Sequence, residues 1–240
     1  MKLPTFRYLS CVISITLLLS TSLTSQIVNA TEEYFGQFDS EPSFTVKTNN
    51  SSRPTFVLNT DLKFIDPNSF NWVAPAKTEV DGASIPSFAW SFVGGPMSGK
   101  YLHASIIHDY FCITKERTAH DTHRNFYYGM RAKGVDESKA KLMYLMVRTF
   151  GPSWKITYTT HSLKGFEKTI TGYTPTAEIS ELPLKQKEEA RQYINNLSET
   201  LERSNGKTAP TVCQSCATYQ LPATLDNLDR ISEELSKKLK

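Results

Sequence analysis

The sequence lacks a long hydrophobic run outside its N-terminal segment, a strong net charge, and any internal repeat or low-complexity tract. Without a second apolar stretch of about 20 residues, no later part of the chain is expected to span a bilayer. The 27 basic residues nearly balance the 24 acidic ones, and no basic stripe is present. Nucleic acid is therefore not an expected partner.

The N-terminal segment has the three parts of a secretory signal peptide. Lys2 and Arg7 supply positive charge, residues 9–19 form a short apolar run, and small residues end the segment at Ala30. A membrane anchor would need about 20 apolar residues, which this run does not reach. We expect cleavage after Ala30 and a periplasmic or secreted protein, most simply a bacterial one.

Removal of residues 1–30 changes both the charge and the count of cysteines. The remaining 210 residues carry 25 basic and 24 acidic residues, so the net charge falls to about +1. A chain of this length can bury one core of about 100–150 residues and a smaller part. Cys112, Cys213 and Cys216 remain. The last two could form a local disulfide, stay as free thiols or bind a metal, and the sequence leaves these three alternatives open.

Short strands are predicted between residues 44 and 80. Aromatic and β-branched residues cluster near Phe44, Phe56, Leu62 and Trp72, and turn-forming residues separate them. This alternation is typical of a small antiparallel sheet or a set of hairpins.

Three helices are predicted after residue 100, where the apolar spacing changes to three and four. They cover roughly residues 101–112, 119–133 and 138–150, with Gly134 as the stop of the second helix and Asp136 or Ser138 as the cap of the third. Residues 154–170 are ambiguous, and a strand is possible near Ile156.

The chain after Pro175 is expected to be a helical extension. Apolar stripes predict helices over residues 184–204 and 225–239, while the nine acidic and nine basic residues of the last 60 balance. We predict a lead-in at 31–43, a core at 44–175 and an extension at 176–240. Under this division, a chain ending near Pro175 should still fold, and the extension could bind a protein partner.

Four of the five histidines lie between residues 103 and 123. His103 and His120 are expected at the surface. The first and second of these helices flank a short loop and must pack antiparallel, which could bring His108 or Asp109 near Asp121 or His123. Such a cluster suits a general base, a divalent metal site, or a structural pair that fixes two helices.

A family resemblance rests on five short motifs in order. They are Asp81-Gly-Ala-Ser-Ile-Pro, His108-Asp109-Tyr110, Phe126-Tyr-Tyr-Gly-Met, Gly134-Val135 and Phe150-Gly-Pro-Ser-Trp154. Together they resemble a bacterial and phage family known as domain of unknown function 1353. The resemblance covers residues 44–154, and the family name implies no activity.

A fainter resemblance links the helices to secreted bacterial phospholipases of the A2 type. It rests on His108-Asp109-Tyr110, on Phe126 with Met130, and on Tyr144, Val147 and Phe150-Gly151. The resemblance implies that His108 is the base that activates water and that Asp109 binds calcium, with Asp81 as a second ligand. His123 occupies the position of the orienting acid, and Asp121 lies two residues earlier.

These patterns predict an α+β protein in which a small N-terminal antiparallel sheet packs on a three-helix unit. The first functional hypothesis is a calcium-assisted lipid-ester hydrolase acting on a lipid or membrane surface, with His108, Asp121 and His123 as catalytic residues. The second is a transition-metal phosphoester hydrolase that uses Asp109 as well. The third is a non-enzymatic, phage-derived structural or interaction domain.

Overall fold

The computed structural model describes residues 33–47, 55–81, 99–160, 168–175, 183–210 and 220–239. The predicted signal peptide, Cys213 and Cys216 lie outside these ranges, so the predictions made for them stay predictions. Within the described ranges, no helix is both long and apolar enough to cross a membrane.

The N-terminal part consists of short antiparallel strands. They are β1 (Gln37–Phe38), β2 (Phe44–Lys47), β3 (Thr55–Leu58), β4 (Leu62–Ile65), β5 (Asn71–Ala74) and β6 (Glu79–Val80). The strands pair in the orders β1-β4-β5 and β2-β3-β6, so the predicted sheet or set of hairpins takes the form of two small sheets. Phe64 lies opposite Trp72, and both pack in a buried cluster with Ile106, Ile107 and Phe111. The strands therefore form a wall against the first long helix.

Three helices follow, as the sequence predicts. They are α2 (Leu102–Thr114), α3 (Ala119–Ala132) and α4 (Glu137–Phe150), preceded by a short 3-10 turn, η2 (Gly99–Tyr101). The Asp136 side chain caps α4 by accepting from the backbone N–H of Ser138 and Lys139. Gly134 follows α3 with a φ of 71°, a left-handed conformation that glycine adopts without a Cβ clash. The predicted cap and stop are both confirmed.

The remaining elements form a hairpin and a pair of C-terminal helices. They are β7 (Trp154–Thr160), β8 (Lys168–Pro175), α5 (Leu184–Arg203), β9 (Thr208–Pro210), β10 (Gln220–Pro222) and α6 (Leu225–Lys238). β7 pairs antiparallel with β8, which resolves the ambiguous segment in favour of a strand. β9 and β10 form a second two-stranded ribbon between the helices.

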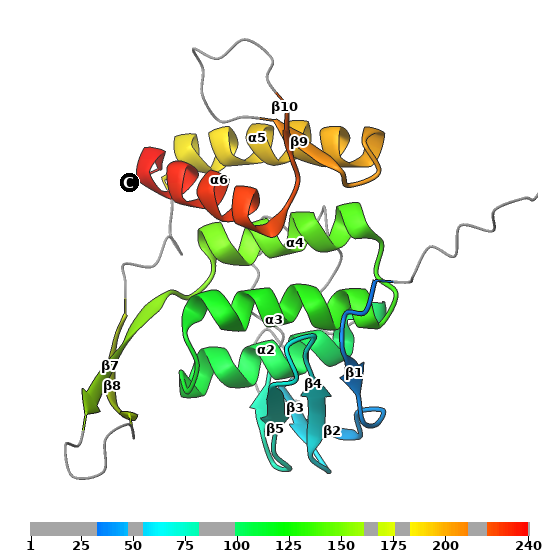
Figure 1. The fold of residues 1–240 in the computed structure, drawn as a ribbon, viewed down its shortest axis with the longest axis vertical. Helices are drawn as coiled ribbons and strands as arrows, with labels where there is room; N and C mark the ends of the chain where they lie inside the picture. Colours follow the sequence, from blue (N-terminus) through cyan, green and yellow to red (C-terminus); the bar gives the residue numbers. More distant parts are fainter. Residues whose placement is uncertain are drawn as a thin grey trace, which may run out of the picture. The chain divides into compact units, whose positions relative to one another are not determined.

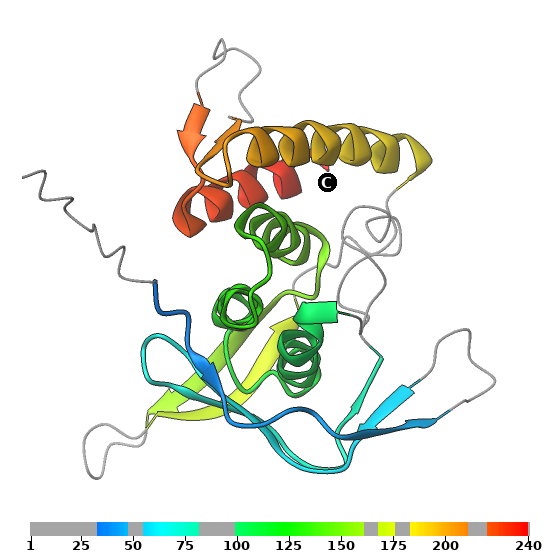
Figure 2. The same cartoon turned by 90° about the vertical axis from the view of Figure 1, so that its right-hand side faces the viewer.

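The helices lie in a layered order that Figures 1 and 2 show from two sides. α2 contacts the strands, α3 lies between α2 and α4, and α5 and α6 both pack on α4. The predicted α+β class, with N-terminal antiparallel strands and C-terminal helices, is confirmed.

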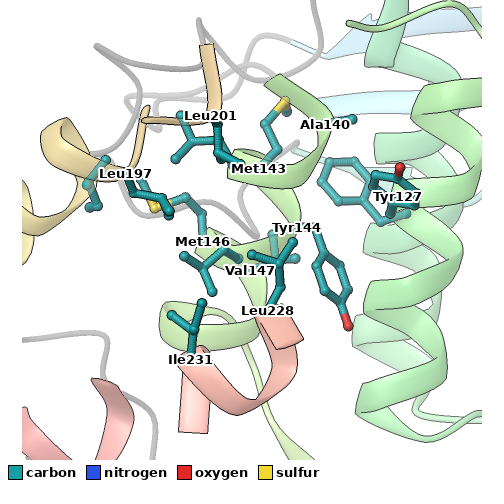
Figure 3. Packing of buried hydrophobic residues seen from close by; sticks show 14 of the residues in the cluster. Tyr127, Ala140, Met143, Tyr144, Met146, Val147, Leu197, Leu201, Leu228 and Ile231 are labelled. Atoms are coloured by element: carbon teal, nitrogen blue, oxygen red, sulfur yellow. The ribbon is translucent and has the colours of Figure 1, made fainter. Parts of the chain in front are cut away.

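The C-terminal helices share a core with α4. Figure 3 shows Met143, Met146 and Val147 of α4 against Leu197 of α5 and Leu228 of α6. All five side chains are buried. The boundary at residue 175 stays a prediction about independent folding, and the packing gives it a specific test below.

Candidate functional site

The buried seam between α2 and α3 brings together two of the predicted site residues. His108 Nε2 lies 2.8 Å from His123 Nδ1, in hydrogen-bonding distance. The two residues are 1% and 0% exposed. The antiparallel packing of the two helices therefore produces the meeting of His108 and His123 that the sequence suggests, and it does so inside the protein.

The hydrogen bonds of His123 determine which nitrogen carries each proton. His123 Nε2 lies 3.0 Å from the carbonyl oxygen of Pro152, which can only accept. His123 therefore carries its proton on Nε2 and accepts through Nδ1, and His108 donates from its own Nε2. Pro152, in the turn after α4, thus orients the pair from a third element.

Cys112 adds a sulfur atom to this pair. It follows His108 by one helical turn, so the two side chains share a face of α2. Its Sγ lies 3.6 Å from His108 Nε2 and 3.8 Å from His108 Nδ1. One ligand atom from each of His108, Cys112 and His123 lies within 4.8 Å of the others, and all three residues are buried. Cys112 is not among the predicted site residues, although the His-x-x-x-Cys spacing on a predicted helix is the signal that indicates it.

Burial keeps both imidazoles neutral. It lowers the pKa of His108 to about 3. It also holds the pKa of His123 well below its ordinary value, and the neighbouring His108 adds to that effect. Neutral imidazole is the form that binds a metal ion.

Asp121 lies in the cap of α3 rather than beside the buried pair. Its Oδ2 accepts from the Thr118 hydroxyl at 2.7 Å, and the same hydroxyl accepts from the Asp121 backbone N–H. Its side chain is about half exposed, at 55%. The geometry thus divides the predicted catalytic set, because His108 and His123 meet while Asp121 faces outward.

The two predicted calcium ligands lie in different surroundings. Asp109 is buried on α2, at 5% exposure, whereas Asp81 is exposed just after β6. Residues 82–98, which follow Asp81, are outside the described ranges. A calcium ion held by Asp109 and Asp81 therefore stays a prediction.

The prediction that His103 lies at the surface is wrong. Its exposure is 5%, its ring packs 5.0 Å from that of Phe38, and its Nε2 lies 2.9 Å from a Glu41 carboxylate oxygen. The N-terminal lead-in covers this face of α2, which helical spacing alone could not indicate.

A second polar cluster surrounds Asp229 of α6. Its carboxylate accepts from Tyr144 at 2.5 Å, Arg148 at 2.6 Å, His120 at 3.0 Å and Arg124 at 3.2 Å. Burial by itself would raise the pKa of Asp229, but hydrogen bonds from His120, Tyr144 and Arg148 outweigh it and hold the pKa well below the ordinary value. The carboxylate is therefore ionised and links α6 to α3 and α4.

Comparison with known proteins gives a family resemblance over part of the chain but no activity. Residues 56–147 match the family model described as protein of unknown function (DUF1353). The family resemblance is confirmed. The DUF1353 match contains His108, Cys112 and His123, and it ends before Pro152 and Asp229.

Two curated relatives come from Sinorhizobium fredii (strain NBRC 101917 / NGR234). "Uncharacterized protein y4jT" is 57% identical over 124 residues, which cover 52% of this chain and 37% of that protein. "Uncharacterized protein y4iH" is 42% identical over 98 residues, which cover 41% of each chain. The chain thus spans less than half the length of these relatives. No solved structure matches it.

Proposed function

We propose that this protein is an exported metal-binding domain that holds one transition-metal ion between His108, Cys112 and His123. The observation that carries the proposal is the convergence of three buried nitrogen and sulfur ligand atoms within 4.8 Å. Export rests on the predicted signal peptide of residues 1–30.

The spacing of the ligand atoms is close to that of a tetrahedral site. Zinc–nitrogen bonds of about 2.0–2.1 Å and zinc–sulfur bonds of about 2.3 Å place nitrogen and sulfur ligands roughly 3.6 Å apart, and two nitrogens roughly 3.3 Å apart. The Cys112 Sγ to His108 Nε2 distance is 3.6 Å. The 2.8 Å between the two imidazole nitrogens is shorter, as a hydrogen bond requires. An ion would replace that bond and move the rings apart by about half an ångström.

The surroundings of the site also suit an ion. The hydrogen bond from His123 Nε2 to the Pro152 carbonyl leaves Nδ1 free of a proton and fixes the ring, which is the usual outer-shell support for a metal-binding histidine. Binding would release the Cys112 thiol proton and would move the His108 proton from Nε2 to Nδ1, so that a thiolate and a neutral imidazole bind the ion.

The ligand set favours zinc or copper over calcium at this position. Two imidazoles and a thiolate are borderline or soft ligands, whereas calcium prefers oxygen. Ester hydrolysis is a weaker proposal, because a general base must reach the water that it activates. His108 is 1% exposed and its Nε2 is engaged by His123. The metal is therefore proposed to brace α2 against α3.

Metal analysis of the purified protein tests the proposal. One equivalent of zinc or copper per chain is expected, and replacement by cobalt should give thiolate-to-cobalt charge-transfer absorption. Cys112→Ser should abolish that absorption, since it removes the only thiolate of the proposed site. A double Cys213→Ser, Cys216→Ser variant is the control, and it should keep both the metal and the absorption.

The opposite pattern would place the metal elsewhere. Retention of the absorption in Cys112→Ser, together with its loss in the double variant, would assign the ion to the other two cysteines. Tight calcium binding that survives Cys112→Ser but fails in Asp109→Asn would favour the esterase hypothesis instead.

A further inference from the structure

A cleft beside α3 is separate from the buried histidine pair. Asp121, Arg124, Asn125 and Tyr128 recur on α3 at the spacing that places side chains on one helical face. A polar helical face normally meets solvent. Here it lines a cavity of about 210 Å³ whose opposite wall includes Phe70 and Trp72 of the β4–β5 region.

The acidic groups that line the cleft already have partners. Asp66 Oδ1 accepts from the backbone N–H of Asn68 and Phe70, and its Oδ2 accepts from the Trp72 indole at 3.0 Å. Asp121 accepts from the Thr118 hydroxyl. The oxygens of these carboxylates are therefore already hydrogen-bonded within the walls of the cleft, and few of their lone pairs remain for a ligand.

Among the basic groups of the cleft, His120 and Arg124 have carboxylate partners, whereas Arg117 is less fully satisfied. The Arg117 guanidinium lies 5.3 Å from the Trp72 ring centroid and 5.8 Å from that of Phe70. Its hydrogen bond to the Asn71 carbonyl is long, at 3.5 Å. A guanidinium held against aromatic rings presents its N–H edge for bidentate recognition of an oxyanion.

His120 adds a second positive charge. Hydrogen bonds with Asp121 and Asp229 raise the pKa of His120 to about 9, so its imidazole is protonated at neutral pH. His120 and Arg117 both line the cleft, close to the N-terminus of α3. The helix dipole at that end also favours an anion, since Ala119 begins the helix.

Asn125 provides an independent sign that a ligand is missing. It is 3% exposed, lines the cleft, and its buried Oδ1 has no hydrogen-bond partner among the described residues. The buried Arg124 Nε also has no hydrogen-bond partner among the described residues. Buried polar atoms in folded proteins are nearly always paired with protein, water or ligand.

We propose that this cleft binds a small oxyanion that also carries a hydroxyl group, such as hydrogen phosphate or a hydroxycarboxylate, between Arg117, His120 and Asn125. Arg117 would supply the paired donors and His120 the second charge. The Asn125 Oδ1 would accept a hydrogen bond from the hydroxyl group of the ligand and so fix its orientation. The site does not depend on the metal proposal, because none of its residues is a proposed metal ligand.

Calorimetric titration of the purified protein at constant ionic strength tests the site. The probes are inorganic phosphate, lactate and propionate, so that a carboxylate is compared with and without a hydroxyl group that can donate to Asn125. Saturable one-to-one binding of at least one probe is expected. Arg117→Gln should raise its Kd about 10–100-fold, as expected for loss of charge-assisted hydrogen bonds, and Arg117→Lys should restore part of the affinity.

Arg230→Gln is the matched control, because it removes the same charge from an exposed position on α6. Its Kd should stay within about twofold of the wild type, since a solvent-exposed charge outside the cleft lining is screened and contributes little. Melting curves establish that each variant is folded, and Asn125→Asp gives a second disruption that leaves Arg117 in place. Absence of saturable binding for all three probes, or equal weakening by Arg230→Gln and Arg117→Gln, would overturn the proposal.

Discussion

The two long seams of this protein differ in what they bury. The seam of α4 with α5 and α6 is built mainly from apolar side chains such as Met143, Met146, Val147, Leu197 and Leu228, with the Asp229 cluster as its polar part. The seam of α2 with α3 instead encloses the pair of His108 and His123, and the two helices bury further polar side chains, namely Asp109, Thr122 and Asn125. Burial of polar groups costs free energy unless each is hydrogen-bonded. The comparison indicates that one seam supplies stability while the other holds reactive groups at a cost in stability.

Removal of the C-terminal helices, and with them the apolar seam, should have the largest effect on stability. A chain ending at Pro175 would expose the faces of α4 that Leu197 and Leu228 cover. We expect loss of cooperative thermal melting, measured by circular dichroism, because several buried side chains each contribute about 1.5–3 kcal/mol. This is the opposite of the outcome predicted from the sequence. A cooperative transition in the shortened chain would restore the division at residue 175.

Asp229→Asn should have the next largest effect, because Asp229 joins the two seams. The substitution leaves Arg148 and Arg124 facing a neutral amide in a buried site. Breaking a buried ion pair by removing one partner costs about 3–5 kcal/mol, and urea denaturation measures that loss. Asp226→Asn is the control, since Asp226 is 83% exposed and pairs with Arg124 at the surface. It should cost at most about 1 kcal/mol, and equal losses in the two variants would contradict this interpretation.

His108→Gln probes the polar seam directly. In metal-free protein it should cost about 1–3 kcal/mol of unfolding free energy, because His123 Nδ1 loses its donor inside the protein. Cys112→Ser leaves the histidine pair intact and should cost less. Excess metal should stabilise the wild type by about 2.7 kcal/mol at one hundred times its Kd and should stabilise neither variant to that extent. Equal metal-induced shifts in melting temperature in all three proteins would show that the ion does not bind at His108 and Cys112.

The smallest expected effect is a pH dependence that arises from His120. Its pKa is raised to about 9 by Asp121 and Asp229, with Arg124 opposing them. Protonation of His120 therefore stabilises the folded state. This stabilisation is complete below about pH 6.5, the pKa of histidine in the unfolded chain. It should disappear as the pH rises through 9. The difference in unfolding free energy between wild type and His120→Gln, measured from pH 6 to 10, should shrink over that interval, whereas a constant difference would exclude the effect.

Local signals in the sequence predicted much of the fold. The Asp136 cap, the Gly134 stop and the three-to-four spacing identify α3 and α4 because these features act within one or two turns. The meeting of His108 and His123 followed from the short loop between their helices. Cys112 was missed because a lone cysteine was considered only for disulfide pairing. The signal peptide and the calcium ligands stay untested predictions.

Longer-range features could not be predicted in this way. Asp229 lies 109 positions after His120, and nothing in either segment indicates their ion pair. The burial of His103 depends on the lead-in strand, and the role of Pro152 depends on the turn after α4. Such contacts depend on how the helices pack against one another. Local patterns in a single sequence do not indicate that packing, and the balanced charges give no further guide to the ion pairs.

The position of Asp229 far downstream of the arginines that it pairs with has a consequence for folding during synthesis. Arg124 and Arg148 emerge from the ribosome long before the carboxylate that pairs with both of them. Until α6 is complete, the two guanidinium groups and the apolar face of α4 have no cover from that helix, so the native arrangement cannot close early. The ion pairs that join α6 to α3 and α4 can therefore form only after synthesis has passed Asp229, which lies 81 residues beyond Arg148.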